Sequence, residues 1–209
     1  MFSTSNDIVA DRGGTGEAGW TLRANHGGGY NYRLAPLGAP LTEATFNKIP
    51  LDFVGPSILR WDRNESSQLA FNTTERGWDT RVGTTPPNSM WRKNPIPHII
   101  NQWDQGGPAF DPPCEESAAC KALALQDGLG PQELCRCSGE PANLEIIDTF
   151  RIPTDIKPGK CKRHHGLRLV CAAEFSDSGA VVCADVLNWR WDCEEGAQIW
   201  NSCVDITVV

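Results

Sequence analysis

The C-terminal stretch of this 209-residue chain, residues 186–209, constrains the fold more than any other part of the sequence. Residues 187–192 read Leu-Asn-Trp-Arg-Trp-Asp, so apolar and polar side chains alternate, and a second alternating run ends at residues 205–209. Alternation with a period of two is typical of half-buried antiparallel strands. The stretch therefore predicts two strands joined by a polar turn through residues 193–197.

Two residues of the second predicted strand are candidates for a functional site. Gln198 and Trp200 are two residues apart, so both side chains should point to the same side of a strand, close to Cys193 and Cys203. A polar and a large aromatic side chain placed together would suit a functional site. The alternative is that Trp200 is a core aromatic residue and Gln198 an ordinary surface residue, because tryptophans are commonly buried.

Further strand patterns occur along the chain and favour an all-β protein. Residues 19–26 and 30–34 alternate on either side of three consecutive glycines, residues 51–71 hold short strands, and residues 143–152 read as another strand. Residues 41–46 have a polar start typical of a short helix. We expect one domain over residues 1–209, because a chain of this length can bury one good core.

The middle of the chain is less regular. Residues 77–113 are rich in Pro, Gly and Asn, which predicts a long loop or several turns that carry Trp78, Trp91 and Trp103. These tryptophans would suit stacking on sugar rings if exposed, and packing over the sheets is the alternative. Residues 115–134 are the best candidate for a longer helix.

The histidine at position 26 lies at the end of a predicted strand, directly before Gly27, Gly28 and Gly29. Glycines let the backbone bend or let another group approach closely. A neutral imidazole in this setting is a good ligand for copper or zinc. A structural role for His26 is the alternative.

Charge and hydropathy exclude two classes of partner. The chain has 19 basic and 26 acidic residues, a net charge of -7, and no basic run or stripe, which argues against nucleic acid and favours a neutral partner such as a polysaccharide. No apolar run approaches the roughly 18 to 20 residues of a membrane span. We therefore expect no membrane span, and we expect a monomer.

Nine cysteines, all in the second half of the chain, point to an oxidising compartment, and their spacing favours disulfides over a structural metal. Glycosylation sequons at Asn64 and Asn72 add a little weight to secretion. No signal peptide is visible at the N-terminus. Either the true N-terminus lies upstream or the cysteines are reduced. We prefer the first and expect a secreted protein.

Two motifs together resemble a known family. Residues 24–34 read Ala-Asn-His-Gly-Gly-Gly-Tyr-Asn-Tyr-Arg-Leu and are followed by Leu-Thr-Glu at 41–43, and residues 198–206 read Gln-Ile-Trp-Asn-Ser-Cys-Val-Asp-Ile. They resemble the copper-dependent lytic polysaccharide monooxygenases of the auxiliary-activity family 15 type, which are chitin-binding type-4-like. The resemblance implies an immunoglobulin-like or fibronectin-III-like β-sandwich with long loops, one bound copper ion, an external electron donor, and oxidative cleavage of a chitin- or cellulose-like polysaccharide.

The resemblance also assigns roles to single residues. It makes His26 the second histidine of the copper site, Trp200 the residue on the axial side of the copper, and Gln198 a glutamine beside it. The family's N-terminal histidine has no counterpart, because this chain begins with Met1. We therefore expect weak or absent copper binding. The competing function is that of a non-catalytic polysaccharide-binding or cell-surface sandwich protein.

Two expectations concern cysteines. Cys193 and Cys203 are expected to form a disulfide that closes the hairpin carrying Gln198 and Trp200, which would stabilise the fold by roughly 2 to 3 kcal/mol. Residues 161–183 fit no strand pattern of the relatives and are expected to be an insertion, either a surface loop or a translated intron. Without its three cysteines, six remain, an even number suited to disulfides. A hairpin of residues 167–171 and 180–185 is the alternative.

Overall fold

The computed structural model describes residues 8–22, 25–66, 68–71, 73, 77–96, 144–156, 185–193 and 197–208. The predicted helix at 115–134 and the predicted insertion at 161–183 lie outside these ranges. The same holds for Trp103 and for the sequon residue Asn72.

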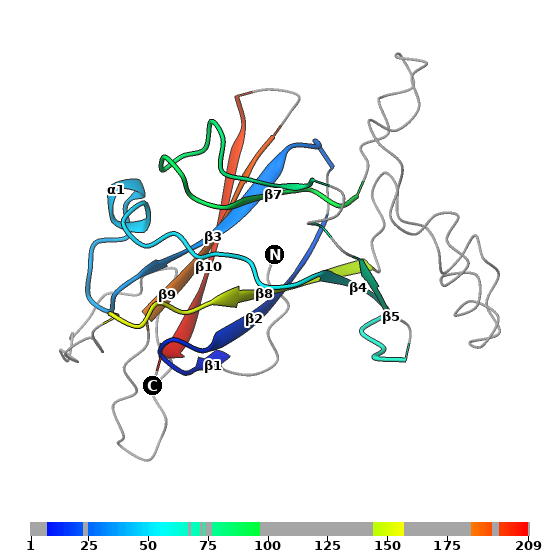
Figure 1. Cartoon of the computed structure of the whole chain (residues 1–209), viewed down its shortest axis with the longest axis horizontal. Coiled ribbons are helices and arrows are strands. Elements are labelled where there is room, and N and C mark those ends of the chain that lie inside the picture. The colour runs from blue at the N-terminus through cyan, green and yellow to red at the C-terminus, as the bar shows by residue number, and fades with distance from the viewer. Residues whose placement is uncertain are drawn as a thin grey trace, which may run out of the picture.

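The described residues form two packed β-sheets, which confirms the predicted all-β sandwich with one short helix (Figure 1). All strand pairs among the described residues are antiparallel except the pair of β1 with β10, which is parallel. The six-stranded sheet has the order β1 (Ile8–Ala10), β10 (Ile199–Val208), β9 (Asp185–Asp192), β3 (Gly29–Ala35), β7 (Trp91–Lys93) and β6 (Asp79–Thr80). The four-stranded sheet has the order β2 (Thr15–Thr21), β8 (Leu144–Arg151), β4 (Ser57–Trp61) and β5 (Gln68–Phe71).

The helix α1 (Glu43–Phe46) is one turn long and begins where the sequence predicts. Thr42 caps it, since its side-chain oxygen accepts a hydrogen bond from the backbone N–H of Thr45. Phe46 packs against Ala35 of β3 and Val186 of β9, so α1 covers part of the outer face of the six-stranded sheet. None of the helices in the described part of the chain is long and apolar enough to cross a membrane.

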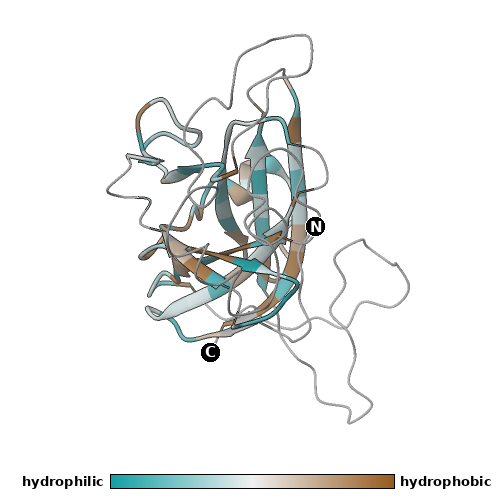
Figure 2. Ribbon diagram, turned by 90° about the vertical axis from the view of Figure 1, so that its right-hand side faces the viewer, coloured by the Kyte–Doolittle hydropathy of each residue, from teal (hydrophilic) through white to brown (hydrophobic). Residues whose placement is uncertain are grey.

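The core lies between the sheets and follows the alternation read from the sequence. Hydrophilic and hydrophobic residues follow one another along the strands in Figure 2. On β9, Leu187, Trp189 and Trp191 are buried in the main core cluster, opposite Leu34, Tyr32 and Tyr30 of β3. Asn188 and Arg190, which alternate with them, point to the outer face and are buried as well, so β9 is not the half-buried strand that the alternation predicts. Successive side chains of a strand point to opposite faces of the sheet, so residues two apart on β9 always share a face.

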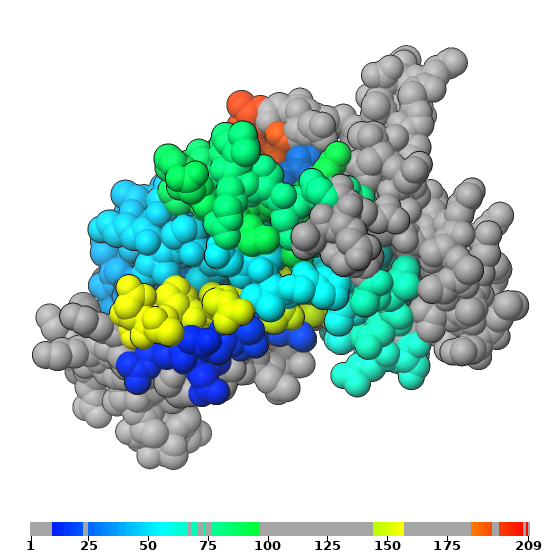
Figure 3. Space-filling view, viewed as in Figure 1, coloured from blue at the N-terminus to red at the C-terminus, as the bar shows by residue number. Residues whose placement is uncertain are grey.

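The segment that the sequence predicts to be a long loop or several turns contains two short strands. Residues 77–96 contain β6 and β7, and in the space-filling view this segment (green) lies against the cyan segment that carries α1 (Figure 3). Trp78 and Trp91 are both buried. Packing is therefore the main role of both tryptophans, and only the 9% of Trp78 and 8% of Trp91 that stay accessible could meet a ligand.

The carboxylate of Asp148 is fully buried between the two sheets. From β3, the hydroxyls of Tyr30 and Tyr32 donate to it at 2.9 and 3.1 Å. Further donors are the indole N–H of Trp20 on β2, the hydroxyl of Ser57 on β4 and the guanidinium of Arg92 on β7. One carboxylate thus receives donors from four strands besides its own, which satisfies it without water.

The guanidinium of Arg92 links Asp148 to a second carboxylate. It donates two hydrogen bonds to Asp79, at 2.7 and 2.9 Å, and its centre lies 4.1 Å from the ring centroid of Phe53. Burial works to lower the pKa of Arg92, but the hydrogen bonds to Asp79 and the charge of Asp148 raise it overall. Burial and the charge of Asp148 raise the pKa of Tyr30 well above its usual value, so its hydroxyl stays a donor.

We predict that Asp148→Asn destabilises the fold by about 3 kcal/mol, because it removes the negative charge that compensates a buried guanidinium and turns one acceptor into a donor. The measurement is denaturant unfolding, followed by tryptophan fluorescence. Asp155→Asn, at an exposed carboxylate beyond β8, is the control and is expected to change stability by less than about 0.5 kcal/mol. Equal stability of the two variants would contradict the prediction.

Candidate functional site

His26 lies in the connection between β2 and β3, at one end of the sandwich. Its ring stacks on Trp191 of β9, with ring centroids 6.3 Å apart and an interplanar angle of 28°. The indole N–H of Trp191 donates to the backbone carbonyl of Gly27 at 2.7 Å. Gly27 and Gly28 both have a positive φ, which glycine adopts without a steric penalty. The glycine run therefore turns the chain so that His26 comes to rest against Trp191.

Trp200 lies on the neighbouring strand β10, directly opposite Trp191. Opposite residues of an antiparallel pair share a face, so Trp200 projects to the same side of the sheet as Trp191. Its side chain is 49% exposed, unlike the buried Trp191. The interpretation of Trp200 as a core residue is therefore wrong, and His26 and Trp200 are both neighbours of Trp191.

Gln198 is exposed and precedes β10. Its backbone carbonyl accepts a hydrogen bond from the N–H of Cys193 at 3.0 Å, which closes the turn between β9 and β10. We refer to His26, Trp191, Gln198 and Trp200 as the Trp200 surface. Trp191 is the member that sequence reasoning missed as a site residue, because its place in the alternating run marks it only as a core residue.

The described residues do not by themselves fit a copper site. Of the four histidines in the sequence, only His26 lies within the described ranges. No group of three or more His, Cys, Asp or Glu side chains that could hold a metal ion occurs within those ranges. One imidazole, the amide of Gln198 and two indoles are too few nitrogen, sulfur or carboxylate ligands for copper.

The predicted disulfide between Cys193 and Cys203 is not formed in the structure. The strand register explains this, because Cys203 lies opposite Asn188, five residues before Cys193. The two side chains also lie on different faces of the sheet. Cys193 packs against the main core cluster, whereas Cys203 packs against the cluster under α1. Cysteines placed in this way cannot reach disulfide geometry without a change of register.

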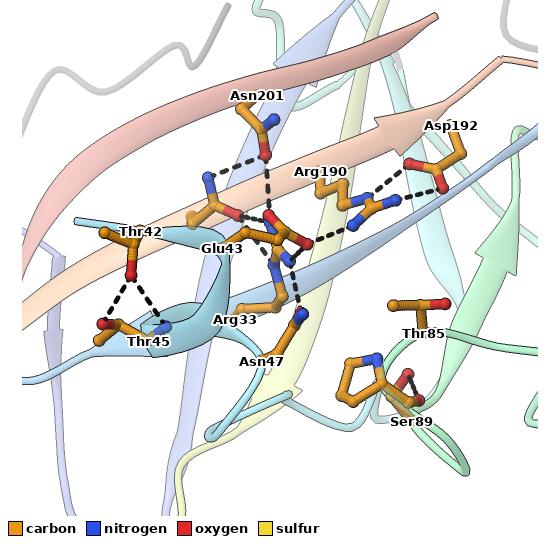
Figure 4. A network of polar contacts seen from close by, with 12 residues as sticks. Arg33, Thr42, Glu43, Thr45, Asn47, Thr85, Ser89, Arg190, Asp192 and Asn201 are labelled. Atoms are coloured by element: carbon orange, nitrogen blue, oxygen red, sulfur yellow. Dashed lines mark hydrogen bonds and ion pairs between the residues drawn. The ribbon is translucent and has the colours of Figure 1, made fainter. Parts of the chain in front are cut away.

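The outer face of the same strands carries a network of charged and amide side chains (Figure 4). At its centre, one carboxylate oxygen of Glu43 on α1 accepts from both Arg33 on β3 and Arg190 on β9. Arg190 also makes two hydrogen bonds to Asp192, at 2.6 and 2.7 Å. Further amide partners of Arg33 are Asn47, Asn188 and Asn201.

This network fixes the charge state of Glu43. Its partial burial acts to raise the pKa, but the hydrogen bond and charge of Arg33, followed by those of Arg190, outweigh burial and lower the pKa below its usual 4.5. Glu43 is therefore ionised at neutral pH and holds α1 against β3 and β9. Through Arg190, the same network orients the carboxylate of Asp192 at the end of β9.

No protein-family model matches the chain, and no curated protein does. Among solved structures, one similar chain is the lytic polysaccharide monooxygenase AA15 from Thermobia domestica in the Cu(I) state, at 10% identity and a TM-score of 0.38. The match covers 96% of this chain and 61% of that protein, so this chain spans about three fifths of its length. The second is AggA, the major subunit of aggregative adherence fimbriae type I from Escherichia coli, at 9% identity and a TM-score of 0.26, covering 100% of this chain and 95% of that one. Neither likeness is close enough to bear on family or function.

We predict that Glu43→Gln lowers stability at neutral pH and that the difference from wild type shrinks below about pH 4. Because the pKa of Glu43 is lower in the folded chain than in the unfolded chain, its stabilising contribution is present above 4.5 and is lost as the pH falls further. The measurement is denaturant unfolding over a pH series. Glu17→Gln, at an exposed position on β2, is the control and should follow the wild type throughout. A pH-independent deficit of Glu43→Gln would argue against this charge network.

Proposed function

We propose that this chain binds a polysaccharide through the Trp200 surface. The observation that carries the proposal is the 49% exposure of Trp200, a large aromatic side chain held on a paired strand at the end of the sandwich. An indole combines an apolar body with a polar N–H, which suits the C–H faces and hydroxyls of a sugar ring. The exposed Gln198 adds an amide donor and acceptor close to it.

The packing around Trp191, opposite Trp200, makes the Trp200 surface rigid. Trp191 is buried opposite Trp200, its N–H is held by Gly27, and its ring packs on Trp189 at 5.9 Å. A rigid anchor loses little conformational entropy on binding. The net charge of -7, without a basic stripe, is also more compatible with a neutral polymer than with an anionic one. From the cysteines and sequons, we propose that the protein acts outside the cell. We also propose that it is a monomer.

The second candidate function is copper-dependent oxidative cleavage of a chitin- or cellulose-like polysaccharide with an external electron donor. The observation that favours it is the position of His26 beside Trp191, the neighbour of Trp200, because the sequence resemblance makes His26 a copper ligand. In this candidate, His26 supplies one ligand and the remaining ligands come from outside the described residues. Copper would supply the redox chemistry, and Gln198 and Trp200 would shape its surroundings.

We predict that Trp200→Ala weakens binding to insoluble chitin or cellulose at least about tenfold, since loss of an interfacial tryptophan commonly costs about 2 kcal/mol. The measurement is depletion of the protein from solution by increasing amounts of each polysaccharide. Leu41→Ala, at a side chain that is 38% exposed just before α1, is the control and should bind as wild type does. Unaltered binding by a folded Trp200→Ala protein would refute the role of this surface.

We also predict that a polypeptide of residues 1–209 shows no tight copper signal of the two-histidine type by electron paramagnetic resonance, because the sequence resemblance assigns it one histidine ligand, His26. Weak Cu(II) binding that decreases in His26→Ala is expected if His26 is a ligand. Isothermal titration with Cu(II) gives the affinity of both proteins. A tight signal in the wild type would contradict the claim of an incomplete ligand set.

A further inference from the structure

A pocket of about 480 Å³ lies on the other face of the six-stranded sheet from the Trp200 surface. Its floor is a row of three residues on adjacent strands: Gly29 of β3 lies opposite Asp192 of β9 on one side and opposite Lys93 of β7 on the other. Since Gly29 has no side chain, the row carries a carboxylate and an ammonium with a gap between them. Neighbouring strands lie about 4.8 Å apart, so the backbones at Asp192 and Lys93 are separated by roughly two strand spacings.

The walls of the pocket are two indoles and one short loop. Trp78 and Trp91 line it. Thr80 at the end of β6, with Thr84 and Thr85 of the connection to β7, closes one side. The indole N–H of Trp91 donates to the carbonyl of Thr85 at 3.1 Å, and the N–H of Val82 donates to the hydroxyl of Thr80 at 3.1 Å. These bonds hold the loop in place, so the pocket is preformed.

The charged groups of the floor are also held in place. Asp192 receives two hydrogen bonds from Arg190, and each of its oxygens still has capacity to accept another. An ammonium such as that of Lys93 carries three donors. A few convergent polar groups between aromatic walls, in a volume of roughly 300 to 1,000 Å³, are typical of small-molecule sites.

We propose that this pocket binds a single neutral sugar ring, a hexopyranose. Such a ring has an apolar C–H face that can contact the small accessible parts of Trp78 and Trp91, and its hydroxyls both donate and accept. Asp192 would accept from one hydroxyl and Lys93 would donate to another, while the ring lies over Gly29. A ligand with a net charge would leave one of the two flanking groups facing a like charge, which is unfavourable.

This site is separate from the Trp200 surface and does not depend on polysaccharide binding there. Trp191 and Trp200 are on the inner face of β9 and β10, whereas Asp192 is one residue further along β9 and points to the outer face. Both sites nevertheless lie at the same end of the sheet, because the glycine run contributes Gly27 to one and Gly28 and Gly29 to the other.

The test is titration of the ¹⁵N-labelled chain with glucose, galactose, mannose and N-acetylglucosamine, followed by nuclear magnetic resonance. We expect at least one of these sugars to shift the amides of Gly28 and Gly29 and the indole N–H signals of Trp78 and Trp91, in a saturable way. Lys93→Met is expected to weaken the binding about tenfold, as loss of one charged hydrogen bond would. Lys48→Met, at an exposed lysine beside α1, is the matched control and should bind as wild type does.

Gly29→Ala is a second variant, which adds a methyl group to the floor. A Cβ at this position would lie 3.1 Å from the carbonyl oxygen of Arg92, a tight contact, so near-ultraviolet circular dichroism must first establish that the variant is folded. A folded Gly29→Ala protein is also expected to bind the sugar more weakly. Trp200→Ala should leave these shifts unchanged, which separates this site from polysaccharide binding.

Three results would overturn the proposal. One is the absence of saturable shifts at Gly28, Gly29, Trp78 and Trp91 with all four sugars. Another is sugar binding that Lys93→Met leaves intact or that Trp200→Ala abolishes, because either would place the sugar elsewhere. The third is binding of glycine, a zwitterion, or of inorganic phosphate, an anion, in place of the sugars, which would assign the pocket to a ligand that carries ionic groups.

Discussion

The buried carboxylate of Asp148 is the constraint on which the rest of the structure depends. It joins β8 of one sheet to β3 and β7 of the other through Tyr30, Tyr32 and Arg92. An ionised group in the core is costly unless every lone pair is used, so the strands that donate to it cannot shift independently. Because β3 and β7 carry Gly29 and Lys93, this polar centre also fixes the positions of the outer pocket.

β9 divides the functional surfaces of the molecule between the two faces of one sheet. Its inward residues include Trp191, which supports His26 and lies opposite Trp200. Its outward residues include Arg190, which connects α1 through Glu43 to the carboxylate of Asp192. A shift of register by one residue would exchange these two sets, so both surfaces depend on the same pairing.

Much of the fold could be predicted from the sequence, because the strong signals are local. The alternation at residues 187–192 and 30–34 identifies β9 and β3 and the residues that point into the main core, and Thr42 marks the start of α1. It does not show that the outward residues of these strands are buried too. The short strands β6 and β7 could not be predicted, since runs of two and three residues carry no periodicity. Their pairing is set by tertiary contacts such as the ion pair of Arg92 with Asp79.

The candidate site was predicted in part, for related reasons. His26 and Trp200 are placed beside the same tryptophan, although they are far apart in sequence, and a motif was enough to single them out. The predicted disulfide between Cys193 and Cys203 was wrong, because spacing along the chain does not show which residues lie opposite each other in a hairpin. The observed register puts the two cysteines on opposite faces of the sheet. The outer pocket was not predicted, because the glycine run at 27–29 indicates only that another group can approach the backbone and says nothing of Asp192 and Lys93 on the neighbouring strands.

The parallel pairing of β1 with β10 has a mechanical consequence. Ile8 lies opposite Ile206 and Ala10 opposite Val208, so the first and last strands of the described chain run side by side in the same direction. A pull on the chain before β1 and after β10 would act along both strands in opposite senses. It would load their backbone hydrogen bonds together, in shear, and not open them one after another. The edge of the six-stranded sheet is thus built to resist stretching between the two ends of the domain.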